Sequence, residues 1–147
     1  MDTEAILGLL KETAAEVITP RFHQLAADEI VEKRPGDLVT IADREAEQRI
    51  GARLADAFPS AVIVGEEAVF SDPGLLSALA GADHAFVIDP IDGTKNFVRG
   101  VPVWATLIAL IDPAVHADRP AVGVVSAPAL ARRWWAAAGG GAHTRFA

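Results

Sequence analysis

Two carboxylates, Asp89 and Asp92, stand three residues apart in the segment Asp-Pro-Ile-Asp-Gly-Thr. Carboxylate and carbonyl oxygens are the ligands that Mg2+ prefers in proteins. On a tight loop the two side chains and the Ile91 carbonyl could converge on one cation. If a short helix opens at Gly93 and Thr94, its first N–H groups suit a phosphate. Asp-Pro and Asp-Gly are also common turn dipeptides, so the hexapeptide alone leaves a purely structural turn as the alternative.

A second acidic pair, Glu66 and Glu67, follows Gly65 in the same way. Short apolar runs precede both segments, at residues 61–64 and 84–88, and runs of this length are typical of buried strands. Acidic residues after a single strand could simply make the end of that strand polar. Two strand ends that meet in space favour a shared cation site instead.

The elements that must position these residues begin with an N-terminal helix. Apolar residues recur there at helical spacing, Asp2 or Thr3 can cap the helix, and Pro20 should end or kink it. A second helix should begin at Thr40, which stands in a capping-box relation to Asp43. On this pattern alone, Asp43 is a helix-start acid favoured by the helix dipole.

Residues 32–37 between these helices are charged and contain Pro-Gly, which predicts an exposed and mobile loop. Lys33, Arg34 and Asp37 are functional candidates by position only, and solvated loop charges are the alternative.

Strands of an antiparallel meander dominate the second part of the chain in this prediction. They are expected at residues 101–111, 121–125, 132–137 and 142–147, and a short helix is expected at residues 75–79. The tryptophans at positions 104, 134 and 135 are interpreted as core or interface aromatics. The four histidines, at positions 23, 84, 116 and 143, lack metal-ligand spacing and receive no role.

Composition narrows the possible functions. The 147 residues are 51% hydrophobic, which suits one domain with its own core. A net charge of -7 argues against a nucleic-acid partner, and the absence of cysteine excludes disulfides and thiolate metal sites. The acidic N-terminus and the short apolar runs predict a cytoplasmic protein without a membrane segment.

Taken together, three segments stand in one order that closely resembles the inositol monophosphatase family of magnesium-dependent, lithium-sensitive phosphatases. They are Asp37-Leu38-Val39-Thr40 with Asp43, Gly65-Glu66-Glu67, and the run from Asp89 to Phe97. The resemblance implies an α+β fold: two helices packed on a largely antiparallel sheet, as in the first half of the family's αβαβα sandwich. Residues 1–147 would then be an N-terminal αβ domain that ends before the family's C-terminal half, which supplies a further aspartate.

The same resemblance implies roles for individual residues. Magnesium would be bound by Glu66, Asp89, Asp92 and the Ile91 carbonyl. Glu66 and Thr94 would orient the attacking water with the support of Asp43, and the substrate would be held by Asp92, Gly93 and Thr94.

The expected activity is magnesium-dependent hydrolysis of a small polyol phosphate such as inositol 1-phosphate, by a homodimer. Lys95 and Trp104 favour histidinol phosphate as an alternative substrate within the family. A second alternative is a catalytically inactive, metal-binding fragment that needs a complementing chain.

Overall fold

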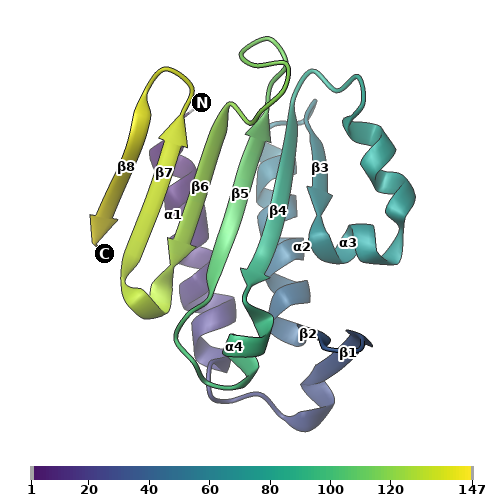
Figure 1. The fold of residues 1–147 in the computed structure, drawn as a ribbon, viewed down its shortest axis with the longest axis vertical. Helices are drawn as coiled ribbons and strands as arrows, with labels where there is room; N and C mark the ends of the chain where they lie inside the picture. Colours follow the sequence, from purple (N-terminus) through teal and green to yellow (C-terminus); the bar gives the residue numbers. More distant parts are fainter. Residues whose placement is uncertain (1, 147) are drawn as a thin grey trace.

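A six-stranded sheet forms the body of the structure, a computed structural model that describes residues 2–146 (Figure 1). In pairing order its strands are β3 (Val62–Gly65), β4 (Ala85–Asp92), β5 (Ala105–Ile111), β6 (Val122–Ala127), β7 (Arg132–Ala137) and β8 (Gly141–Phe146). β3 runs parallel to β4, and each later strand is antiparallel to its neighbour. The expected α+β fold with a largely antiparallel sheet is therefore confirmed.

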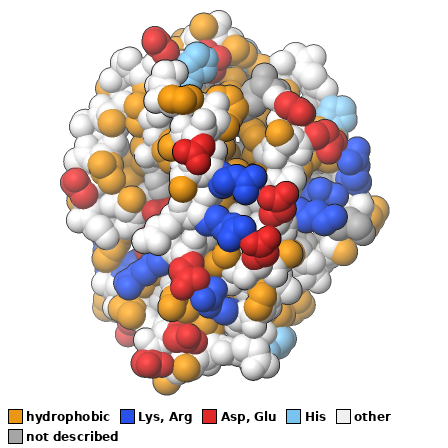
Figure 2. Space-filling view, turned by 180° about the vertical axis from the view of Figure 1, so that it is seen from behind, with side chains coloured by type: hydrophobic (Ala, Val, Ile, Leu, Met, Phe, Trp, Pro, Cys, Tyr) orange, Lys and Arg blue, Asp and Glu red, His pale blue; other side chains and the backbone are white. Residues whose placement is uncertain are grey.

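Two helices cover one face of the sheet and lie behind it in Figure 1. α1 (Thr3–Thr13) continues as a π-helical turn and then as a 3-10 turn that contains Pro20, and α2 spans Ile41–Ala57. Pro20 ends the first helix as expected, because proline has no N–H to continue the hydrogen-bond ladder. Figure 2, which views the molecule from this side, shows acidic and basic side chains interspersed on its surface.

The main core lies between these helices and the sheet. Its largest fully buried side chains include Leu7, Leu10, Ile50 and Leu54 from the helices and Phe86 and Ile88 from β4. Alternation along β4 and β5 sends every second side chain to this helical face. Each such side chain contributes roughly 1.5–3 kcal/mol by leaving water, so the helices are held firmly against the strands.

A second apolar cluster fixes the end of β4 and the short helix α4 (Thr94–Val98). Ile91, Phe97 and Trp104 are buried in it against Ile18 and the start of α2. The ring of Trp104 meets that of Phe97 edge to face, with centroids 5.1 Å apart. Trp104 is therefore a core aromatic as predicted, and it anchors the segment that carries Asp89 and Asp92.

The prediction of a loop at residues 32–37 is wrong. These residues belong to an antiparallel hairpin formed by β1 (Ile30–Arg34) and β2 (Asp37–Thr40), with Gly36 at a φ of +78° in its turn. Backbone pairing satisfies the peptide groups of this charged segment, so its polarity did not require an irregular loop.

The strand expected at residues 101–111 begins only at Ala105. The preceding residues instead wrap around α4, where the Asn96 side-chain amide donates to the Val103 carbonyl at 2.8 Å. The short helix expected at residues 75–79 is a 3-10 helix over Pro73–Leu79. The last strand reaches Phe146, and Ala147, expected to end it, lies outside the described residues.

One further helix, α3 (Glu66–Ser71), follows β3 directly and was not expected from the sequence. It makes the Glu66–Glu67 pair a helix start rather than a plain strand end. Within residues 2–146, no helix has both the length and the apolar character needed to cross a membrane.

Candidate active site

Six of the seven predicted site residues line a single open pocket of about 280 Å³. They are Glu66, Asp89, Ile91, Asp92, Gly93 and Thr94. The pocket lies where β4 ends, next to the start of α3 and the β1–β2 hairpin, which contributes Gly36 and Asp37. Because β3 and β4 are parallel neighbours, their carboxyl ends bring the two acidic segments to the same edge of the sheet.

The end of β4 has an irregular backbone that turns its side chains into this pocket. The pairing register with β5 shifts between Asp89 and Asp92. Gly93 follows at a φ of +89°, and a Cβ there would lie 3.0 Å from the Val103 carbonyl oxygen. Only glycine fits this position without strain, and α4 begins directly after it.

Asp89 is a partly buried acid whose ionisation is unfavourable in the folded chain. Its Oδ1 atom is buried without a hydrogen-bond partner in the described part of the chain. Burial, followed by the nearby charges of Glu66 and Asp92, raises the pKa of Asp89 to about 8. A buried carboxylate beside other carboxylates is stable only with a proton or a cation, so this donor set fits a divalent cation.

The acidic side chains do not form a ready-made cage, since no three potential ligands converge closely enough anywhere in residues 2–146. Lys33 from β1 instead stands among them. Its ammonium group lies 2.9 Å from a carboxylate oxygen of Glu67, 3.4 Å from one of Glu66 and 3.8 Å from one of Asp37. Lys33 therefore supplies positive charge to the acidic start of α3, which carries the predicted ligand Glu66.

Lys33 was expected to be a solvated loop charge, and this alternative is wrong because only 4% of its side chain is exposed. Burial by itself would lower the pKa of Lys33. The hydrogen bond and charge of Glu67, together with the charges of Glu66 and Asp37, outweigh it and raise the pKa above its ordinary value. Lys33 therefore remains charged and ties the hairpin to α3.

Replacing Lys33 by methionine should lower the stability of the metal-free chain by about 1–3 kcal/mol, because Glu67 would keep its charge without its partner. The pKa of Glu67 is itself raised, first by burial. The loss should therefore be largest near pH 7 and should shrink as the pH falls and Glu67 takes up a proton. Urea unfolding at pH 7 and pH 4 measures it. The control is Lys11→Met on α1, and equal effects of the two substitutions would contradict the prediction.

Asp43 lies beneath the pocket and is 1% exposed. Its Oδ2 accepts from the Thr40 amide at 2.7 Å and from the Thr40 hydroxyl at 2.6 Å, which confirms the capping box. Its Oδ1 lies 3.0 Å from the hydroxyl of Thr94. Burial raises the pKa of Asp43, while the bonds from Thr40 and Thr94 oppose the rise. Asp43 therefore caps the start of α2 and also accepts a hydrogen bond from Thr94, while its role in orienting water stays a prediction.

Thr94 has one hydroxyl proton and two acceptors within reach, the Asp43 carboxylate and the Ile91 carbonyl at 2.9 Å. Of these two acceptors, the carboxylate is the stronger. A cation bound to the Ile91 carbonyl would occupy the weaker one, so the hydroxyl proton of Thr94 would then be donated to Asp43. The lone pairs of Thr94 could then accept from a water in the pocket.

Sequence reasoning missed Glu47, whose carboxylate accepts from the backbone amides of Glu67 and Ala68 at 2.8 and 2.9 Å. Only its position one helical turn after Asp43 could have indicated that it faces the same way.

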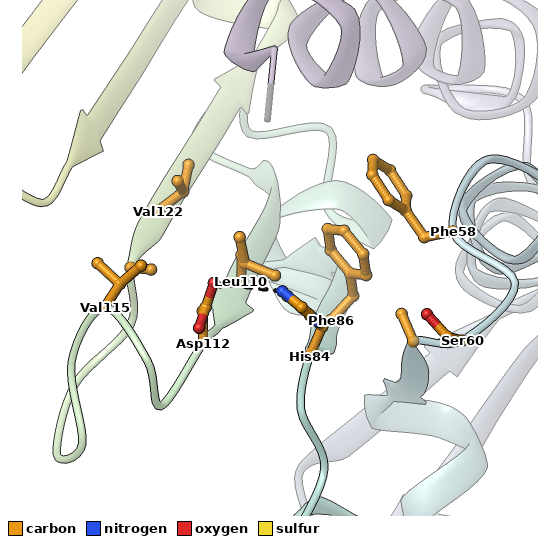
Figure 3. A pocket seen from close by; sticks show the side chains of 10 residues that line it. Phe58, Ser60, His84, Phe86, Leu110, Asp112, Val115 and Val122 are labelled. Carbon is orange, nitrogen blue, oxygen red and sulfur yellow. Dashed lines mark ion pairs between the residues drawn. The ribbon is translucent and has the colours of Figure 1, made fainter.

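A larger pocket, of about 350 Å³, lies at the opposite end of the sheet (Figure 3). Phe58, Phe86 and Leu110 line it, and His84 pairs with Asp112 at its rim at 3.3 Å. His84 precedes β4 whereas Asp89 lies near its other end, so this apolar pocket is separate from the acidic one.

Comparisons with known proteins find relatives over most of the chain. The model of the inositol monophosphatase family matches residues 2–145. A histidinol-phosphatase of Streptomyces coelicolor is 43% identical over 98% of the chain and 51% of its own length, and one of Mycobacterium tuberculosis is 47% identical over 90% and 46%. An inositol-1-monophosphatase of Mesorhizobium japonicum is 32% identical over 97% of the chain and 51% of its length. The chain thus spans about half the length of the curated relatives it matches.

A solved IMPase of Thermotoga maritima has the same fold over 97% of the chain and 50% of its own, with a TM-score of 0.78 and 30% identity. The described elements therefore correspond to about half of that fold.

Proposed function

Because the chain belongs to the inositol monophosphatase family, we propose that it forms the N-terminal αβ part of a magnesium-dependent phosphatase acting on histidinol phosphate. One observation carries the choice of substrate. The two histidinol-phosphatases are 43% and 47% identical to the chain, against 32% for the inositol-1-monophosphatase. The resemblance alone puts inositol 1-phosphate first, but these identities support the histidinol phosphate alternative better.

Magnesium would be held by the carboxylates of Glu66, Asp89 and Asp92 and by the Ile91 carbonyl. The buried, unpartnered oxygen of Asp89 and its raised pKa support this donor set. When bound, the ion supplies a water of lowered pKa and positive charge near the transferred phosphoryl group.

The chain's own residues would orient the water and the substrate. Thr94, with its proton directed to Asp43, would accept a hydrogen bond from the water, and Glu66 would accept its proton. Gly93 and Thr94 lie where a phosphate could approach the backbone closely, because Gly93 has no side chain. Asp92, on the open side of the pocket, would face the alcohol end of the substrate. A homodimer and inhibition by lithium complete the proposal.

Phosphate release from histidinol phosphate and inositol 1-phosphate, with magnesium titrated, tests the choice of substrate. We expect kcat/KM for histidinol phosphate to be at least about tenfold higher, a discrimination that a few polar contacts can supply. Glu66→Gln should abolish release from both substrates without unfolding the chain, and Asp56→Asn, an exposed change on α2, should leave release unchanged. A preference for inositol 1-phosphate would contradict the proposed substrate.

A second candidate is a metal-binding unit that turns over substrate only with a complementing segment. Two observations favour it: the chain covers about half of its relatives, and no described element covers the front face of the sheet in Figure 1. By strand alternation that face carries Val87, Leu107 and Val125, which are only half-buried. No turnover on either substrate, in a chain that magnesium still stabilises, would support this candidate.

A further inference from the structure

Glu47, on α2, reaches across to the start of α3. One oxygen of its carboxylate accepts from the Glu67 amide and the other from the Ala68 amide, at 2.8 and 2.9 Å. These are the second and third residues of α3, whose first amides have no partner within the helix. Gly65, at the capping position, has no side chain to satisfy them. Glu47 therefore caps α3 from a different helix.

Gly65 is required for this contact for a steric reason rather than a conformational one. Its φ of -103° is open to any residue. A Cβ at Gly65, however, would lie 2.1 Å from the carboxylate carbon of Glu47. Any other residue would push Glu47 off the two amides.

A carboxylate at this place costs more electrostatic free energy than an uncharged capping side chain would. Burial raises the pKa of Glu47, and the charge of Glu66 raises it further, while the bonds to the Glu67 and Ala68 amides and the charge of Lys33 oppose the rise. A serine or asparagine at position 65 would cap α3 without placing another charge beside two glutamates. What the longer contact adds is a connection between α3 and α2.

Through this connection, one face of α2 contacts two parts of the pocket. Asp43 and Glu47 are one turn apart on α2, so their side chains leave the same face. Asp43 bonds the hydroxyl of Thr94, and Glu47 bonds the turn that bears Glu66. The side chain of Glu66 is 45% exposed, and its ion pair with Lys33 is long at 3.4 Å, so this pair holds the carboxylate weakly.

We propose that Glu47 is a positioning residue: it fixes the Gly65–Glu66 turn against α2 and so sets the place of the Glu66 carboxylate relative to Asp89 and Thr94. The proposal rests on the proposed function in taking Glu66 as a magnesium ligand. Partners that orient a ligand in this way typically contribute 10–100-fold to metal affinity.

Glu47→Gln tests the proposal, because the amide keeps the shape but offers one acceptor where two N–H groups need two. In the metal-free chain, exchange of the Glu67 and Ala68 amide hydrogens should accelerate about tenfold or more. The magnesium concentration that gives half of the full thermal stabilisation should rise by about 10–100-fold. The matched control is Glu45→Gln, which removes a carboxylate of the same helix that pairs with Arg21 at 2.7 Å rather than with α3, and it should change neither quantity.

Gly65→Ala provides a second route, because the added methyl group displaces the Glu47 carboxylate without removing its charge. Both substitutions break one contact, so the double variant should shift the magnesium midpoint no further than the larger single effect. Additive shifts would overturn the proposal, as would faster amide exchange with an unchanged midpoint, since Glu47 would then be a structural cap only.

Failure of the proposed function has a different signature. It would appear as a wild-type chain that magnesium does not stabilise, and the link from Glu47 to a metal ligand would fall with it. Failure of the present inference alone would appear as a wild-type response that Glu47→Gln leaves unchanged.

Discussion

Asp89→Asn is expected to abolish the response of the chain to magnesium and, at the same time, to stabilise the metal-free fold. The first effect follows because the substitution removes the most buried charge of the proposed metal site. The second follows because that charge opposes folding when no cation is present: burial and the carboxylates of Glu66 and Asp92 raise the pKa of Asp89 to about 8.

The pH dependence follows from the sign of this shift. A carboxyl whose pKa is higher in the folded than in the unfolded chain binds its proton more tightly when folded. Its ionisation therefore costs no stability below about pH 4, an increasing amount as the pH rises toward 8, and its full amount above that. Asparagine does not ionise, so the advantage of Asp89→Asn should grow over the same range.

Thermal unfolding with and without magnesium at pH 4, 7 and 9 measures both effects. Because the side chain of Asp89 is only partly shielded from water, we expect a gain of about 1–2 kcal/mol at pH 7, well below what the full shift would give. The melting temperature should then rise by about 3–6 °C without magnesium. Asp56→Asn, an exposed change on α2, should show neither effect. A variant that is less stable at pH 9 than the wild type, or that still responds to magnesium, would contradict the account.

Asp43→Ala should have the largest effect on stability. The substitution leaves the buried amide and hydroxyl of Thr40 without their acceptor and removes the reciprocal cap of α2. A lost cap costs about 1 kcal/mol and each unsatisfied buried donor about 1–3 kcal/mol, so we expect a loss of about 2–4 kcal/mol. Urea unfolding in the absence of magnesium measures this loss.

Thr94→Val separates the two roles of Asp43. It removes one donor, the hydroxyl at 3.0 Å, and leaves the cap of α2 intact. We expect a loss of only about 1 kcal/mol together with a large loss of any phosphate release. If Thr94→Val were as destabilising as Asp43→Ala, or if it kept full activity, the assignment of Asp43 to two separate roles would be wrong.

The sequence predicted the location of the pocket because its signals are local. Each acidic segment directly follows an apolar strand, and the Thr40–Asp43 pair starts a helix by contacts three residues apart. Parallel pairing of β3 with β4 then brings the two segments together. The turn after Asp92 also has a local signal, since Gly93 adopts a φ of +89°, which favours glycine.

The burial of Lys33 and the contacts of Glu47 were missed because they depend on residues that are distant in the sequence. The burial of Lys33 comes from Glu66 and Glu67, 33 and 34 residues away, and the role of Glu47 comes from amides 20 and 21 residues away. The sequence predicted a loop in place of the β1–β2 hairpin because its charged side chains were interpreted as exposed to solvent. Because Lys33 has acidic partners at the start of α3, Lys33 and Arg34 pack against that helix instead.

In the proposed function, the end of β4 and the start of α3 form one cation site. A crystal of the chain soaked in Mn2+, which takes the same oxygen ligands as Mg2+ and scatters anomalously, tests it most directly. We predict an anomalous peak in contact with the carboxylates of Asp89 and Glu66 and the carbonyl of Ile91, and no such peak in Asp89→Asn. A saturated soak with no peak in this pocket, or with a peak bound only elsewhere on the surface, would contradict it.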